Sequence, residues 1–106
     1  MPKYLLDVNY THDGIRGVRA QGGSARQAAA QAAAESVGGT VESFFFAFGA
    51  TDVYVIADLP DNVAAASLAL AVTAAGGATV KTVVLLTPAD VDAAVGREVS
   101  YRPPGS

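Results

Sequence analysis

The chain lacks cysteine and has few charged residues. Because none of its 106 residues is cysteine, a disulfide framework and a thiolate metal site are both excluded. A chain without cysteine does not indicate whether its compartment is oxidising or reducing. Charged residues make up 16% of the sequence and hydrophobic residues 51%, so the surface is either poor in charge or partly covered by another subunit. We therefore expect the protein to associate with itself.

Basic residues and long apolar runs are also scarce. Lysine and arginine together number 7 against 10 acidic residues, for a net charge of -3, and they form no stripe that could track a nucleic-acid backbone. No apolar run approaches the roughly 20 residues of a membrane span. Asp7 interrupts the N-terminal segment before a signal-peptide core could form. These absences predict a cytoplasmic protein with neither nucleic-acid nor membrane partners.

The apolar residues that are present alternate in the pattern of β-strands. In residues 3–10 every second side chain falls on the same face, and one of the two faces is aromatic or aliphatic throughout. Further strands are predicted at residues 40–48, 52–59 and 78–86. The second and third are expected to pair as an antiparallel hairpin across a tight turn at residues 49–52.

Helix start and stop signals fall between these strands. A broken helix is predicted after the first strand: it starts at residues 11–13, pauses at Gly22 and Gly23, and resumes with Ser24 as the N-cap of residues 25–37. Asp61 is the expected cap of a helix that runs to about residue 75. Its core-facing residues are expected to be Ala64, Leu68, Ala71, Val72 and Ala75.

A short helix and a stiff tail are predicted at the C-terminal end. Thr87 has the chemistry of an N-cap and Pro88 suits the first helical position, so a helix is expected to about residue 95. Residues 97–106 contain adjacent prolines and are too few to fold alone. We expect them to form an extended arm that drapes over a neighbouring subunit.

The order of these elements predicts a single α+β domain spanning residues 1–106. Strand, helix, strand, strand, helix, strand is the ferredoxin-like βαββαβ arrangement, an antiparallel sheet with helices on one face, extended here by the short helix and the tail. The third strand is apolar on both faces, with Tyr54 and Ile56 on the second. An antiparallel sheet facing water shows a cleaner alternation, so that face is expected to pack against another copy.

Four short segments carry a resemblance to a known family. They are residues 2–5 (PKYL), 10–14 (YTxxG), 22–26 (GGSAR) and 48–53 (FGxxDV), and they resemble the GYD domain family over nearly the whole chain. The resemblance implies a small bacterial protein of ferredoxin-like fold that self-associates in the manner of the dimeric α+β barrels, with no assigned general activity. Gly49 and Asp52 match the motif that names the family, but Thr51 stands where a tyrosine is commonly expected.

His12 is the only histidine and has candidate catalytic neighbours. With Asp13, Arg16 and Tyr10 it could form a general acid/base group at the mouth of the sheet. The alternative is an exposed histidine in a first helical turn, where the helix dipole favours Asp13. A zinc site needs three or four convergent ligands, so a metal is not expected.

A second set of polar residues lies on the strands. Asp7 and Asn9 share one strand face, and Asp52 and Tyr54 begin the third strand, so these groups are candidates to bind a ligand in an otherwise apolar cavity. In the alternative interpretation Asp52 caps the hairpin turn, and Asp7 and Asn9 face solvent or a subunit boundary.

The glycine pair before the second helical piece is a third candidate site. Free backbone N–H groups at Gly22, Gly23 and Ser24, with Arg19 and Arg26 nearby, could hold an anion. The spacing and the lysine of a phosphate-binding P-loop are missing, and the alternative is a simple helix break.

Two functional hypotheses remain open. The first is a homo-oligomeric binding or structural module whose apolar cleft, between sheet and helices, holds a small apolar ligand. The second is a cofactor-independent enzyme, such as an isomerase, decarboxylase or monooxygenase, acting on a small apolar or aromatic compound. An enzyme is expected to gather at least two of the polar candidates in one pocket, whereas a module can leave them scattered. No cofactor is expected in either case.

Overall fold

The alternating strands form one antiparallel sheet. The computed structural model describes residues 1–105, which contain four strands and four helices. The strands are β1 (Lys3–Tyr10), β2 (Thr40–Phe46), β3 (Val53–Asp58) and β4 (Ala78–Leu85). They lie in the order β2-β3-β1-β4, and each neighbouring pair is antiparallel.

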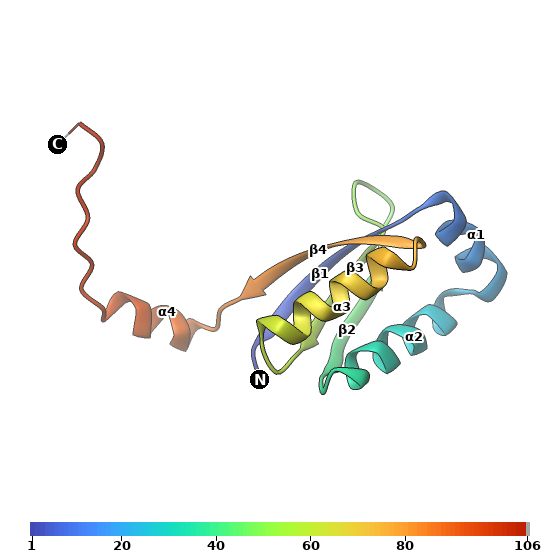
Figure 1. Ribbon diagram of the computed structural model, residues 1–106, viewed down its shortest axis with the longest axis horizontal. Coiled ribbons are helices and arrows are strands. Elements are labelled where there is room, and N and C mark those ends of the chain that lie inside the picture. The colour runs from blue at the N-terminus through green and yellow to red at the C-terminus, as the bar shows by residue number, and fades with distance from the viewer. Residues whose placement is uncertain (106) are drawn as a thin grey trace.

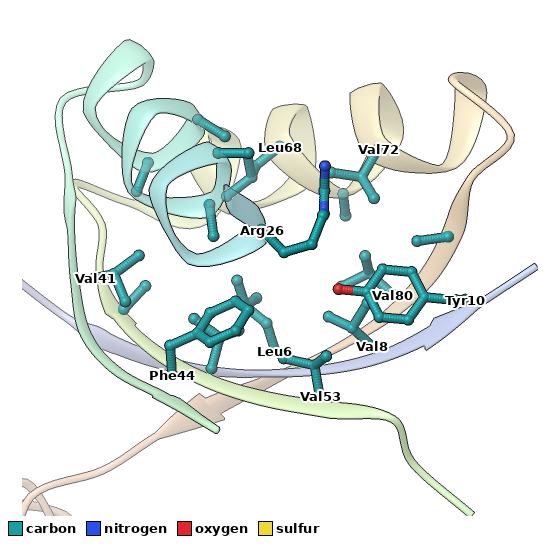
Figure 2. Close-up of a pocket in the computed structure, with 18 residues that line it drawn as sticks. Leu6, Val8, Tyr10, Arg26, Val41, Phe44, Val53, Leu68, Val72 and Val80 are labelled. Carbon is teal, nitrogen blue, oxygen red and sulfur yellow. The ribbon is translucent and has the colours of Figure 1, made fainter. Parts of the chain in front are cut away.

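The helices connect and cover these strands. Helices α1 (His12–Gln21) and α2 (Gly23–Ser36) join β1 to β2, α3 (Asn62–Ala74) joins β3 to β4, and α4 (Pro88–Val95) follows β4. Helix α2 packs on β2 and α3 packs on β4, and both lie over the same face of the sheet (Figures 1 and 2). This α+β arrangement is compatible with the predicted ferredoxin-like fold.

The core lies between the sheet and these two helices. Alternate residues of β3, namely Val53, Val55 and Ala57, are buried there together with Tyr4 and Leu6 of β1. The pairing register brings Leu6 opposite Val55 and Tyr4 opposite Ala57, so one face of each strand contributes to a shared apolar layer. The period-two pattern of residues 3–10 is thereby confirmed.

Helix α3 begins where its cap was predicted. Asp61 is extended and its Oδ1 accepts a 2.8 Å hydrogen bond from the Ala64 N–H, which satisfies one of the free donors of the first turn. The buried Tyr4 hydroxyl donates a 2.6 Å hydrogen bond to Oδ1 of Asn62. This bond ties the start of α3 to β1 and satisfies the buried phenol.

The second face of the sheet stays open within residues 1–105. The register places Leu5 of β1 opposite Ile56 of β3 and Val83 of β4 on that face, and Tyr54 opposite Phe45 of β2. Phe45 is 68% exposed. Apolar side chains thus cover a face that no helix of the described chain covers (Figure 1).

Helix α4 extends away from the rest of the molecule (Figure 1). It has the predicted start: Thr87 and Asp90 cap each other in a capping box with bonds of 2.9 and 3.1 Å, and Pro88 is the first helical residue. Its Val95 is 78% exposed. Residues 97–105 continue without helix or strand, and Ser106, the last residue of the predicted arm, lies outside the described residues.

The turn between β2 and β3 is longer than predicted. Strand β2 ends at Phe46 and not at residue 48, and β3 begins at Val53 and not at Asp52. Asp52 is held by the end of β1, because its N–H donates to the Val8 carbonyl and its Oδ2 accepts from the Tyr10 N–H at 2.9 Å. These contacts open the expected tight turn into a loop that carries Phe48 into solvent.

The predicted N-cap at Ser24 is wrong. Gly22 adopts a φ of 83° and is both the C-cap residue of α1 and the N-cap residue of α2. No side chain caps the start of α2. Ser24 therefore lies inside the first turn of α2, where its backbone is already helical, whereas a capping side chain needs an extended residue before the helix. The prediction that the glycine pair breaks the helix is confirmed.

Candidate functional site

A cavity lies between the sheet, α2 and α3. Its volume is about 110 Å³, and Figure 2 shows side chains from the strands below and from both helices above pointing into it. The side of α2 that faces it consists of alanines, including Ala29, Ala30 and Ala33. Because alanine ends at its Cβ, this helix covers the sheet without filling the space above it.

The cavity is lined almost wholly by apolar side chains. Leu6, Val8 and Val53 form its floor, and Leu68 and Val72 of α3 close the opposite wall. At one side stands Phe44, whose ring meets that of Phe46 edge to face with centroids 5.3 Å apart, a favourable geometry for aromatic pairs.

A wider groove adjoins the cavity. It has a volume of about 620 Å³ and lies between α2 and α3, with α1 at one end. Ala71 of α3 and its C-cap residue Ala75 line it and are exposed, so the prediction that these two face the core is wrong. The core contacts of α3 come instead from the buried Ala65 and from Leu68, for which the prediction of a core-facing position is confirmed.

Arg26 and Tyr10 supply the polar side chains of the cavity, as far as residues 1–105 show. Arg26 comes from the first turn of α2 and extends toward Val72 of α3, while the Tyr10 hydroxyl points inward (Figure 2). Both residues also line the groove. The Nε atom of Arg26 is buried, and no group within the described chain accepts a hydrogen bond from it.

The candidate acid/base group is spread over two places. His12, Asp13 and Arg16 are exposed on α1, and the ion pair between Arg16 and Asp13 is 3.8 Å long. None of the three is among the cavity-lining residues of the described chain, whereas Tyr10 is. The structure thus separates Tyr10 from the other members of that set.

The strand candidates lie on the other side of the sheet. Asp7 and Tyr54 are paired on the open face, where the Thr51 hydroxyl donates a 2.7 Å hydrogen bond to Oδ1 of Asp7. Asn9 is on the same face of β1. Oδ2 of Asp52 accepts a hydrogen bond from the Tyr10 N–H, which ties the hairpin loop to the end of β1; that Asp52 caps the hairpin turn stays a prediction.

The helix break separates the two candidate arginines. Arg19 is exposed on α1, and Arg26 reaches the cavity. A Cβ added to Gly23 would lie 2.9 Å from the Phe46 ring, so this glycine permits the close approach of α2 to β2. The glycine pair thus places Arg26 at the cavity but does not bring Arg19 beside it to hold an anion.

The described part of the chain contains neither a cluster of metal ligands nor a membrane-spanning helix. Within residues 1–105, no three His, Asp or Glu side chains gather closely enough to hold a metal ion. In the same part of the chain, every helix is too short or too polar to cross a membrane.

Several site residues were missed from the sequence. The alanines of α2 define the cavity, yet they carry no chemical signal beyond their clustering. Phe44 and Val41 of β2 close one side of it. The alanine-rich composition of residues 25–37 was the available signal, because a helix of small side chains packed over large strand residues leaves space.

Comparison with known proteins identifies the family. Searches among curated proteins and among solved structures found no significant match. The model of the family described as "GYD domain" matches residues 4–95, which run from the second residue of β1 to the last residue of α4 and include all the residues that line the cavity. The chain therefore belongs to the GYD domain family.

Proposed function

We propose that this protein is a homo-oligomeric domain that holds a small apolar compound in the cavity beneath α2 and α3. The observation that carries the proposal is the cavity itself, which lies in the core of a small domain and is about 110 Å³ in volume. An engineered apolar cavity of about 150 Å³ stays dry and binds benzene or xenon. The expected ligand is accordingly about the size of one aromatic ring, unless it also reaches into the groove.

An empty cavity of this size is costly to the fold. An enclosed void costs about 24 cal/mol per Å³, so a partly open cavity of 110 Å³ costs at most roughly 2–3 kcal/mol, beside the roughly 5–15 kcal/mol that stabilises a domain. A ligand that fills the void recovers part of this free energy and stabilises the folded state through its binding. A cavity maintained at that cost supports a binding role.

The open sheet face and α4 support self-association. Helix α4 has 8 residues, far fewer than the roughly 12–15 that an isolated helix needs in water, and it lies away from the sheet of its own chain. Phe45, Tyr54 and Val83 are exposed on the open face. A second copy whose open face packs against the first, with α4 and the arm on its partner, would cover both surfaces.

The enzyme hypothesis gains no support from the positions of its residues. Tyr10 lines the cavity, His12 and Arg16 are exposed on α1, and Asp7 lies on the far side of the sheet. The binding module is the function that the geometry supports best. A cytoplasmic location, a bacterial source and a single domain over residues 1–106 stay predictions from the sequence.

Uptake of a neutral probe tests the proposal. Toluene is titrated into the ¹⁵N-labelled full chain, and amide shifts are followed by NMR. We expect saturable shifts at cavity residues, including Val53, Val55 and Leu68. Ala30→Leu fills the cavity and is expected to abolish them, whereas Ala32→Leu, on the exposed side of α2, is expected to leave them unchanged. Equal shifts in both variants, or none in the wild type, would contradict a ligand site here.

A further inference from the structure

Arg26 brings a permanent positive charge to an apolar cavity. Among the residues that line the cavity and the groove in the described chain, none is Asp or Glu. The ion pairs found within residues 1–105 involve Lys3 and Arg16 and not Arg26. The guanidinium carries five N–H donors and no acceptor, so its natural partner is a group that accepts hydrogen bonds.

One donor of this partly exposed side chain is buried without a partner within residues 1–105. The buried Nε of Arg26 has no hydrogen-bond partner in the described part of the chain, and a buried donor left unsatisfied costs free energy that a buried pair would not. Natural proteins satisfy most buried hydrogen-bond donors. The missing partner of Arg26 is therefore a feature to be explained.

We propose that the ligand of this cavity is a small organic acid, whose carboxylate is held by Arg26 and whose apolar body fills the space above Val53. The inference rests on the proposed binding function and adds the chemical class of the ligand. The planar guanidinium matches a carboxylate with two parallel hydrogen bonds, which gives orientation as well as affinity.

The position of Arg26 suits this arrangement. Its side chain extends from α2 toward Val72 of α3 (Figure 2) and lines both the cavity and the groove. A carboxylate at the guanidinium lies where these two spaces meet, with its apolar end directed to the floor. The Tyr10 hydroxyl, which points into the cavity, offers the acid a further donor.

The competing explanation is that Arg26 only contributes its alkyl stem. Long basic side chains often cover apolar surface with their methylenes while the charged end stays in water, and the groove is open to water. In that case the cavity does not distinguish a charged ligand from a neutral one of the same shape. The two explanations make opposite predictions for a matched pair of probes.

Benzoate and benzyl alcohol form that pair, because they share a ring and differ in charge. Their affinities for the full chain are measured by NMR titration at fixed ionic strength, for the wild type, Arg26→Gln and Arg19→Gln. Arg19 is exposed and lines neither space, so its replacement controls for the loss of net charge. Preserved amide spectra establish that each variant is folded.

We expect the wild type to bind benzoate about tenfold or more tightly than benzyl alcohol, the usual scale of a charge-assisted hydrogen bond. Arg26→Gln is expected to remove this preference without weakening benzyl alcohol, and Arg19→Gln to keep it. Equal binding of both probes by the wild type, or equal losses in both variants, would overturn the acid proposal while leaving the cavity as a ligand site. Binding of neither probe would overturn the proposed function as well.

Should Arg26→Gln fail to fold, the wild-type comparison still decides the matter, because it needs no variant. Arg26→Lys adds a second readout. It keeps the charge but loses the planar fork, so benzoate binding is expected to fall between those of the wild type and Arg26→Gln. Benzoate affinity in Arg26→Lys as low as that of benzyl alcohol would contradict an electrostatic role of this position.

Discussion

The hydroxyl of Thr51 donates a 2.7 Å hydrogen bond to Oδ1 of Asp7 and so joins the loop before β3 to the middle of β1. Thr51 is only 6% exposed, although it lies in a loop. The residue that departs from the family's expected tyrosine is thus a structural contact. This hydrogen bond also occupies Oδ1 of Asp7, whose carboxylate was a candidate ligand-binding group.

Thr51→Val is expected to destabilise the fold. The change keeps the shape of the side chain but removes the donor, which leaves Oδ1 of Asp7 without this partner and costs about 1–2 kcal/mol. Urea unfolding measures the difference. Thr82→Val, at an exposed position of β4, is the control, with an expected change within about 0.5 kcal/mol. Equal stability of the two variants would show that the Thr51 contact contributes nothing.

Gly14→Ala and Gly17→Ala are expected to have opposite effects, although both lie in α1. A Cβ at Gly14 would overlap the carbonyl oxygen of Gly77, whereas a Cβ at Gly17 meets nothing within 4 Å. The overlap is expected to cost about 1–3 kcal/mol, and Gly17→Ala to gain up to about 1 kcal/mol from helix propensity.

Thermal unfolding of the two alanine variants provides the measurement. The close approach at Gly14 is fixed by two bonds from Thr11, whose N–H and hydroxyl donate to the carbonyls of Gly77 and Gly76 at 3.0 and 2.8 Å. A Gly14→Ala protein as stable as the wild type would mean that α1 does not pack on this turn.

Lys3 is expected to make stability depend on pH in the alkaline range. Hydrogen bonds to Glu42, at 2.6 Å, and to Asp58, at 2.9 Å, raise the pKa of Lys3 above its ordinary value of 10.5. Because the folded state holds the proton more tightly, the stabilisation is complete below pH 10.5 and is lost as pH rises through the folded pKa.

The difference in unfolding free energy between the wild type and Lys3→Gln measures this effect. It should be constant from neutral pH up to about the ordinary lysine pKa and then shrink. Glu42→Gln removes the larger cause of the raised pKa of Lys3, so in that variant the difference should be smaller and its decline should be complete at lower pH. A difference that grows with rising pH would have the wrong sign for this ion-pair cluster.

Phe45→Glu is expected to disrupt self-association. It places a charge on the open face of the sheet, opposite Tyr54, where a second copy would have to bury it. Phe48→Glu, in the exposed loop, is the matched control. Sedimentation velocity should show at least twice the chain mass of 10.7 kDa for the wild type and Phe48→Glu, and the single-chain mass for Phe45→Glu.

A chain ending at Glu98 tests the contribution of the arm. Loss of the following residues should weaken the oligomer and lower its melting temperature. Unchanged mass and melting temperature would remove the role of the arm, and a monomeric wild type at micromolar concentration would remove self-association altogether.

Local chemistry made much of the fold predictable. Period-two alternation located β1, and the side chains of Asp61 and Thr87 located the starts of α3 and α4. The boundaries that failed depend on contacts distant in sequence. Asp52 is drawn to the end of β1 by Tyr10, and nothing in the neighbouring residues of the loop indicates this.

The candidate site was predictable only in part. Tyr10 and Arg26 were named from the sequence and both line the cavity, but each was assigned to a different cluster. Polar residues attract attention in a sequence, whereas the space beside them depends on the volumes of Ala30, Ala33 and their neighbours across several elements. A cavity is a property of packing, and packing is set by the tertiary fold.

A crystal structure of the wild-type protein under xenon pressure tests most directly whether the cavity is an available ligand site. Xenon binds apolar cavities without requiring any particular hydrogen bond. We expect a xenon atom enclosed between Val53, Leu68 and the alanines of α2, and none there in Ala30→Leu. Absence of xenon from the wild type, with the lining side chains closed over the space, would contradict a ligand-binding function for this domain.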